Sequence, residues 1–186
     1  MDHWELSKSV EPVCQIRFIL VVVLATLVIP NFGLTLDSSP EPANVICPAT
    51  PNSLASMRDC YRPLLLFAPS MNLPEFVHQL DELRAHASEV KERDIMVVPI
   101  ISNQQVSSSL PADLPNAALS SLEASAARSR FKVSTHSFQV ILIGKDGSQK
   151  YSSKTPVAFD KLSALVDSMP MRKQEIRQRS QGGKPQ

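Results

Sequence analysis

The stretch from Phe138 to Tyr151 constrains the fold more than any other part of the chain, because it has the pattern of two strands joined by a tight turn. Four consecutive apolar residues, Val140 to Ile143, cannot all face one side of a strand. They predict a strand inside a sheet, covered on both faces. The next strand, 147–152, is polar and carries Lys150, which is typical of a sheet edge. Between the strands, residues 144–147 read Gly-Lys-Asp-Gly, which favours a tight turn.

Two apolar runs earlier in the chain, 62–69 and 95–101, have the length of buried strands. Pro99 cannot donate a ladder hydrogen bond, so the far end of the second run should lie at a sheet edge. A long helix is expected between the runs, with Asn72 as its cap and Pro74 in its first turn. Apolar residues at alternating spacings of four and three predict its core face: Phe76, Leu80, Leu83, Ala87 and Val90. A strand, a helix and a strand in this order form a right-handed crossover with parallel strands.

Further helices are predicted at 117–131, at 157–166 and, after the break at Pro170, at 170–179. The whole pattern predicts one α/β domain with a mixed central sheet of about four strands flanked by helices and preceded by a hydrophobic signal helix. The predicted organisation is a signal peptide or signal anchor at 1–36, a Pro-rich linker at 37–58, the folded domain at 59–179, and a disordered tail at 180–186.

The amino-terminal apolar run, Phe18 to Ile29, follows Arg17 and precedes Pro30. It is shorter than the roughly 20 apolar residues of a membrane-spanning helix. A secretory signal peptide therefore fits best and predicts a secreted or periplasmic protein. The alternative is an uncleaved anchor, through which the domain would be held at a membrane and face outside. The net charge of +1 does not indicate a nucleic-acid partner.

The chain has three cysteines, and Cys14 would be removed with a signal peptide. The remaining two, Cys47 and Cys60, could form one disulfide in an oxidising compartment. Two interpretations of Cys60 stay open: a structural half-cystine or buried thiol, and a redox-active thiol displaced from its usual place.

The order of strands and helices is that of a thioredoxin-like fold, whose catalytic cysteines follow the first strand. Here that segment reads Ala-Pro-Ser-Met-Asn-Leu over residues 68–73, without a cysteine, and Ser70 has no evident base. A cis-proline at the start of the central hairpin strand is another landmark of the fold, but Gln139 occupies that region. No catalytic residue is therefore assigned.

Other candidate residues give weaker signals. His78 and His86 are too far apart on the expected helix for a metal pair and are expected to be solvated, and His136 fits a turn or capping role. No Gly-rich phosphate loop is present, so no cofactor is expected. The basic carboxy-terminal helix could contact an anionic surface such as a glycan or a lipid headgroup, or be an ordinary solvated helix end. Its candidate residues are Arg172, Lys173, Arg177 and Arg179.

Several segments together resemble the family named domain of unknown function 4174, which is thioredoxin-like. These segments are Arg-Pro-Leu-Leu-Leu-Phe-Ala-Pro (62–69), Glu-Arg-Asp (92–94), Val-Ile-Leu-Ile-Gly-Lys-Asp-Gly (140–147) and Asp-Ser-Met-Pro-Met-Arg (167–172). Members occur as exported bacterial proteins and at the end of vertebrate sushi-repeat-containing and coiled-coil-domain-containing matrix proteins. The resemblance therefore implies an extracytoplasmic setting and adhesion or matrix roles, although this chain has no sushi module. It supplies no catalytic residue.

The sequence thus predicts an exported, redox-inactive thioredoxin-like domain that binds an unknown protein or glycan partner outside the cytoplasm. The alternative is a thiol-dependent oxidoreductase or peroxidase-like enzyme that uses Cys60 with Cys47 as its resolving partner.

Overall fold

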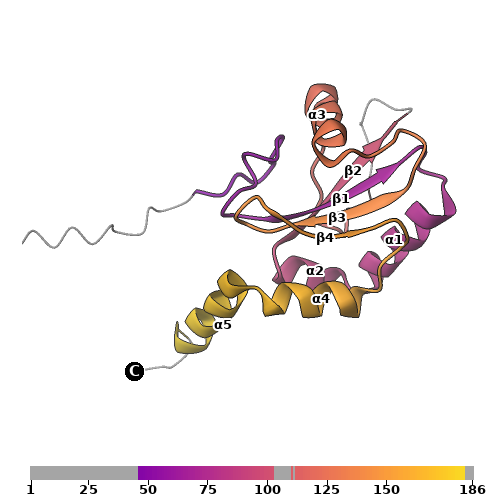
Figure 1. Cartoon of the computed structure of the whole chain (residues 1–186). Helices are drawn as coiled ribbons and strands as arrows, with labels where there is room; N and C mark the ends of the chain where they lie inside the picture. Colours follow the sequence, from indigo (N-terminus) through magenta and orange to yellow (C-terminus); the bar gives the residue numbers. More distant parts are fainter. Residues whose placement is uncertain (1–45, 103–109, 111, 183–186) are drawn as a thin grey trace, which may run out of the picture. The chain divides into compact units, whose positions relative to one another are not determined.

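The structure is a computed structural model that describes residues 46–102, 110 and 112–182, which all lie in one compact unit. The predicted signal segment 1–36 and the first part of the predicted linker lie outside the described residues. Four strands form one sheet in the order β2-β1-β3-β4 (Figure 1). Their bounds are β1 Arg62–Ala68, β2 Ile95–Ile101, β3 Gln139–Ile143 and β4 Gln149–Ser153.

The strand directions follow the predicted crossover and hairpin. Strand β1 pairs with β2 in parallel and with β3 antiparallel, and β3 pairs with β4 antiparallel. This sheet is that of the thioredoxin-like fold, so the predicted fold class is confirmed. Strand β3 lies inside the sheet, β4 lies at one edge and β2 with its Pro99 lies at the other, each as predicted.

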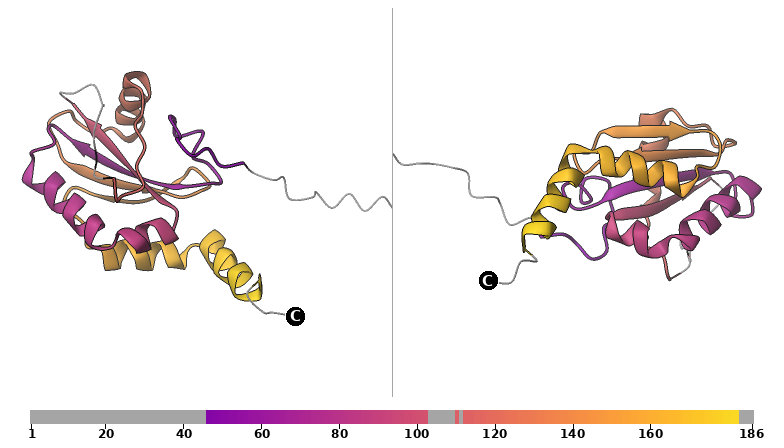
Figure 2. Two further views of the ribbon diagram at one scale, coloured as in Figure 1. Left: turned by 180° about the vertical axis from the view of Figure 1, so that it is seen from behind. Right: turned by 90° about the horizontal axis from the view of Figure 1, so that it is seen from below.

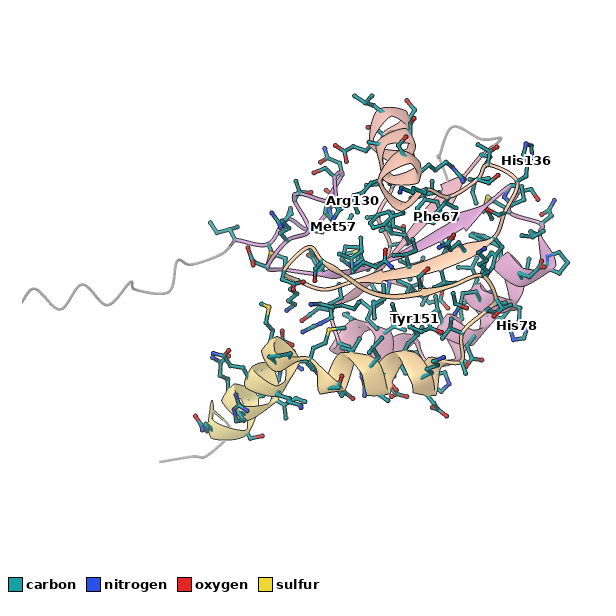
Figure 3. The ribbon with its side chains drawn as sticks, viewed as in Figure 1. Met57, Phe67, His78, Arg130, His136 and Tyr151 are labelled. Carbon is teal, nitrogen blue, oxygen red and sulfur yellow. A yellow bond between two sulfur atoms is a disulfide. The ribbon has the colours of Figure 1, made fainter. Side chains whose placement is uncertain are left out.

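Each inner strand contributes to two hydrophobic cores, one on either face of the sheet. In β3, Val140 and Leu142 pack into one core, whereas Ile141 and Ile143 pack into the other. Successive side chains of a strand point to opposite faces of the sheet. A strand that is buried on both faces therefore needs a continuous apolar run. Figure 3 shows Phe67 on the side of the second core and Tyr151 on the side of the first.

Helices cover both faces of the sheet. Figures 1 and 2 show α1 Pro74–Ala85, α2 Ala87–Glu92 and α4 Phe159–Ser168 on one face and α3 Ser121–Phe131 on the other. Helix α5, Pro170–Gly182, follows α4 after a break at Met169 and includes the first three residues of the predicted disordered tail. Among the described residues, no helix has the length and apolarity that a membrane span requires.

The first long helix differs from its prediction in two ways. Leu73, and not Asn72, is the residue before the helix, and no side chain caps it. The helix also breaks at His86, so the predicted single helix is the pair α1 and α2. The imidazole of His86 stacks on the ring of Phe159 in α4, with ring centroids 4.6 Å apart. His86 is therefore packed against the core and is not the solvated residue that the sequence predicted.

Helix α3 begins four residues later than predicted, because the residues before it pair with β2. The Val97 amide donates to the Pro115 carbonyl (2.9 Å), and the Ala117 amide donates to the Val97 carbonyl (3.0 Å). This short parallel bridge extends the edge of the sheet before the chain turns. Ser120 then caps the helix by accepting from the Glu123 amide at 3.2 Å.

The last part of the predicted linker packs against the domain. Met57 is fully buried in the second core, and Leu54 packs beside it. The Asp59 amide donates to the Lys145 carbonyl at 2.8 Å, which ties this segment to the turn between β3 and β4. The folded domain therefore begins before residue 59, the boundary expected from the density of prolines.

Candidate functional site

The carboxyl end of β1, where thioredoxin-like enzymes carry their thiols, is formed here by Ala68, Pro69 and Ser70. No hydrogen bond joins the Ser70 side chain to a base in the described residues. His136 is exposed, and Figure 3 shows it on the opposite side of the sheet from His78. A nucleophile without a base in reach is not activated. The described residues at this end thus bring no nucleophile and base together.

A half-buried arginine closes this end of the sheet. The guanidinium of Arg128 donates to the carbonyls of Ala68 (3.3 Å) and Ile100 (2.7 Å) and lies 5.3 Å from the centre of the Phe67 ring. Burial lowers the pKa of this guanidinium from its usual value. At the start of β3, the Gln139 amide donates to the Ser152 hydroxyl at 2.8 Å. The Arg128 guanidinium and the Gln139 amide at this end are therefore hydrogen-bonded within the protein.

Cys47 and Cys60 form a disulfide, with their Cα atoms 5.5 Å apart. Cys60 is buried and precedes β1, so the disulfide lies at the amino end of that strand and not at the end where a thioredoxin-like enzyme carries its thiols. The bond joins residues 13 positions apart in the sequence and holds the segment before β1. Such a bond constrains the unfolded chain and so stabilises the fold.

A cluster of eight charged side chains lies at the same end of the sheet. We call it the charge cluster, and it consists of Arg62, Glu92, Arg93, Asp94, Lys145, Asp167, Arg172 and Glu175. At its centre, Glu175 of α5 lies 2.9 Å from both Arg62 and Lys145, and Lys145 is also 2.9 Å from Asp94. Arg62 is only 1% exposed. Helix α5 is thereby joined to β1 and to the β3–β4 turn.

The second half of the charge cluster joins α5 to α4 and α2. Arg172 donates to Asp167 at 3.1 Å and to both carboxylate oxygens of Glu92 at 2.5 Å. Arg93 lies 2.9 Å from Asp167. Arg172 is 3% exposed, so the prediction that it contacts an external anion is wrong, because it is buried among carboxylates of its own chain. Arg179 also pairs with Glu92, at 2.8 Å, whereas Lys173 and Arg177 are exposed.

The carboxylates of the charge cluster are held in their ionised form. Burial raises the pKa of Glu175, but Arg62 and Lys145 outweigh burial and bring this pKa below its usual value. Burial also raises the pKa of Asp167, but Arg93 and Arg172 outweigh burial and bring this pKa below its usual value. Four cations face four anions, so the cluster is neutral without a ligand. A partly buried network whose charges balance is a structural device, and the geometry assigns it no catalytic acid or base.

All members of the charge cluster except Glu175 come from the four segments that carry the family resemblance. Sequence reasoning identified the segments but could not tell that they meet.

The β3–β4 turn is held by hydrogen bonds of its own. The Asp146 carboxylate accepts from the Ser148 amide at 3.1 Å and from Lys150 at 2.7 Å. The hydrogen bond from Lys150 is the main cause that lowers the pKa of Asp146 to about 2.

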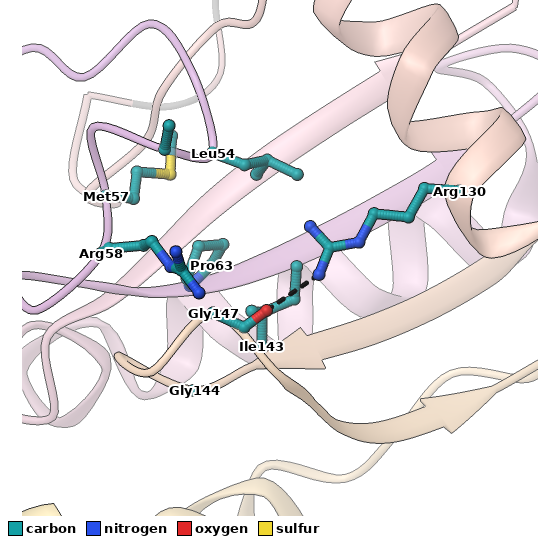
Figure 4. Close-up of a pocket in the computed structure, with 9 residues that line it drawn as sticks. Leu54, Met57, Arg58, Pro63, Arg130, Ile143, Gly144 and Gly147 are labelled. Atoms are coloured by element: carbon teal, nitrogen blue, oxygen red, sulfur yellow. Dashed lines mark hydrogen bonds between the residues drawn. The ribbon is translucent and has the colours of Figure 1, made fainter. Parts of the chain in front are cut away.

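A pocket with a volume of about 210 Å³ lies beside this turn, on the face of the sheet that α3 covers. Figure 4 shows Arg58 and Arg130 at its two sides, with Gly147 between them. Arg58 donates to the Asp146 carbonyl at 3.1 Å, and Arg130 donates to the Gly147 carbonyl at 2.9 Å. No sequence pattern indicates this pocket, because neither arginine belongs to a motif.

Known proteins with similar structures share little sequence identity with this chain. No curated protein matches the chain significantly. Among solved structures, thioredoxin peroxidase I of Plasmodium yoelii has 16% identity and a TM-score of 0.47, covering 65% of this chain and 79% of that one. The peroxidoxin BcpB of Mycobacterium tuberculosis has 17% identity and a TM-score of 0.48, covering 62% and 84%.

An exposed lipoprotein thioredoxin of Streptococcus pneumoniae has 14% identity and a TM-score of 0.45, covering 62% of this chain and 90% of that one. Identity at this level extends no activity of those proteins to this chain. At the level of sequence, residues 53–175 match the family model named domain of unknown function, DUF4174. The match spans most of the chain, including the charge cluster from Arg62 to Glu175. The chain therefore belongs to the DUF4174 family, as the four segments indicated.

Proposed function

We propose that this protein is an exported, redox-inactive thioredoxin-like module that binds a partner outside the cytoplasm. One observation carries the proposal. The segment after β1 has no cysteine, and the two cysteines of the described residues are bonded to each other at the other end of the strand. A thioredoxin-like enzyme needs a thiolate at the segment after β1. In this chain that segment contains Ser70 and no thiol.

Two features support export. The apolar run Phe18 to Ile29 has the length of a signal-peptide core. The disulfide between Cys47 and Cys60 belongs to an oxidising compartment, because cytosolic thiols are kept reduced. Sequencing the amino terminus of the mature protein tests this part of the proposal. A mature chain that still begins at residue 1 would favour the anchored alternative.

Helix α5 supports the binding role. Lys173, Ile176 and Arg177 are exposed, and their spacing places them on one face of the helix. Neither Lys173 nor Arg177 has a carboxylate partner in the described part of the chain. A basic face with an apolar residue suits an anionic glycan or an acidic protein surface. We retain Lys173 and Arg177 as anion-contacting residues, with Arg179 at the margin because it also pairs with Glu92.

The redox part of the proposal is tested by assaying the purified protein for disulfide reduction and for thiol-dependent peroxide turnover. We expect neither activity above the rate without protein. The alternative, an enzyme using Cys60 with Cys47, predicts turnover that Cys60→Ser abolishes. Turnover of that kind would overturn the proposal. A thiol titration with and without reductant, done in parallel, shows whether the disulfide is formed in solution.

The binding part is tested by retention on an immobilised sulfated glycan. We expect the double variant Lys173→Gln, Arg177→Gln to elute at lower salt than the wild type. The matched control is Lys161→Gln, which removes an exposed cation from α4 and should leave elution unchanged. Equal elution of all three proteins would exclude the α5 face as a glycan contact and leave a protein partner.

A further inference from the structure

The pocket between Arg58 and Arg130, which we call the arginine pocket, combines two cations with an apolar lining. Leu54, Met57, Pro63 and Ile143 contribute the apolar surface. The guanidinium groups of Arg58 and Arg130 lie on opposite sides of the pocket (Figure 4). The pocket is therefore amphipathic, with two cations around an apolar lining.

Within the described part of the chain, the two arginines lack the counterions that Arg62, Arg93 and Arg172 possess. Each makes one hydrogen bond to a backbone carbonyl, although a guanidinium has five N–H donors. Neither has a carboxylate within ion-pair distance among the described residues, whereas Arg62, Arg93 and Arg172 each have at least one. The nearby Asp146 carboxylate is engaged by Lys150. Two like charges facing one pocket leave a net attraction for an anion.

The arginine pocket is also formed in advance of any ligand. The disulfide at Cys60 and the bond from the Asp59 amide to the Lys145 carbonyl hold the segment that supplies Arg58. Gly147 has a φ of 75°, a conformation that favours glycine, and the Arg58 guanidinium lies close above its Cα. Arg130 lies over the ring of Phe131, 4.9 Å from its centre. A rigid site loses less entropy when it binds a ligand.

We propose that the arginine pocket binds a small organic carboxylate with a short apolar body. A carboxylate matches the planar fork of a guanidinium. The volume of about 210 Å³ exceeds the roughly 150 Å³ of a cavity that holds benzene, so a body of about six carbons fits. A bare inorganic anion would leave the apolar lining uncovered, and a neutral alcohol would leave both arginines without a counterion. The inference is independent of the redox proposal, because no cysteine takes part in the binding.

The test is a titration of the full-length protein with hexanoate, followed by isothermal calorimetry and amide NMR shifts. We expect saturable binding with shifts at Leu54, Arg58 and Gly147. Acetate, hexanol and inorganic phosphate should each bind at least about tenfold more weakly, because each lacks either the apolar body or the carboxylate. Hexanol binding as tightly as hexanoate, or the absence of saturation, would overturn the proposal.

Variants locate the site. We expect Arg58→Gln and Arg130→Gln each to weaken hexanoate binding by about tenfold, because each removes one charged fork. Arg177→Gln on α5 is the matched control and should bind as the wild type does. Arg130→Lys keeps the charge and should bind with intermediate affinity, which gives a test even if a Gln variant fails to fold. Loss of affinity in Arg177→Gln equal to that in the pocket variants would refute the assignment.

Discussion

The two ends of β1 have opposite polar organisation. At the carboxyl end, one cation, Arg128, bonds backbone carbonyls, and the described residues there include no ion pair. At the amino end, the charge cluster, the Cys47–Cys60 disulfide and the arginine pocket gather around the β3–β4 turn. The sheet is that of thioredoxin-like enzymes, but in the described residues the network of ion pairs lies at the end that those enzymes do not use for thiol chemistry.

A second contrast lies within the amino end itself. The charge cluster is dense but neutral, because its cations and anions pair with one another. The arginine pocket has only Arg58 and Arg130, yet neither has a counterion in the described residues. Density of charge therefore does not identify a ligand site here. What matters is whether the charges are already paired within the fold, since a paired buried group has little left to offer a ligand.

The largest predicted effect comes from breaking the charge cluster with Arg62→Met. Arg62 is 1% exposed, and its loss leaves Glu175 with Lys145 as its main partner. We expect the free energy of unfolding to fall by about 3 kcal/mol, measured by urea denaturation. The control is Arg84→Met, which removes exposed pairings with Asp81 and Asp113 and should cost less than about 1 kcal/mol. Similar losses in both variants would show that the cluster does not stabilise the fold.

The next effect concerns the disulfide. The double variant Cys47→Ser, Cys60→Ser should lower the free energy of unfolding by about 2 to 3 kcal/mol, because the unfolded chain regains the freedom of the closed loop. Urea denaturation with and without reductant measures it, and the wild type under reductant should approach the variant. An unchanged midpoint would indicate that the bond does not form in solution.

At the carboxyl end, Arg128→Met should have a smaller effect than Arg62→Met. The variant leaves the Ile100 carbonyl without its bond from Arg128, which costs about 1 to 2 kcal/mol, whereas the long apolar side chain keeps part of the packing on Phe67. The same urea experiment measures the loss. A larger loss in Arg128→Met than in Arg62→Met would show that the carboxyl end of β1 contributes more to the free energy of unfolding than the charge cluster does.

The sequence predicted those parts of the fold that depend on local pattern. The apolar run Val140 to Ile143 identified an inner strand, and Pro99 identified an edge, because burial on two faces and a missing donor act within a few residues. The predicted cap at Asn72 was wrong, because the helix begins at Pro74 with Leu73 before it. The predicted unbroken helix was also wrong, because the chain breaks at His86, whose ring packs on another element. The stacking of His86 on Phe159 brings together residues that are far apart in the chain.

The candidate site was less accessible to sequence reasoning. Arg172 was grouped with exposed cations because helix periodicity does not reveal that Glu92 and Asp167 approach from two other elements. The pairing of Cys47 with Cys60 remained open because loop length alone does not determine whether two thiols meet. Arg58 and Arg130 form no motif, and only the folded sheet brings them to one pocket.

The smallest predicted effect is a pH dependence at the turn that separates the charge cluster from the arginine pocket. The pKa of Asp146 is lowered to about 2, chiefly by the hydrogen bond from Lys150. A carboxyl group whose pKa is lower in the folded state stabilises the fold above its unfolded pKa, and this contribution disappears as the pH falls through the folded pKa. Because the side chain is 47% exposed, water screens the ion pair.

Asp146→Asn isolates this charge, since the asparagine oxygen still accepts from the Ser148 amide. At neutral pH the variant should lose less than about 1 kcal/mol of unfolding free energy relative to the wild type. The difference should shrink below about pH 4 and vanish only below about pH 2, where the wild-type carboxyl group is itself mostly protonated. Urea denaturation over this range measures it, with Lys150→Gln as the partner variant. A difference that stays constant with pH would mean that Asp146 stabilises the fold through turn geometry and not through its charge.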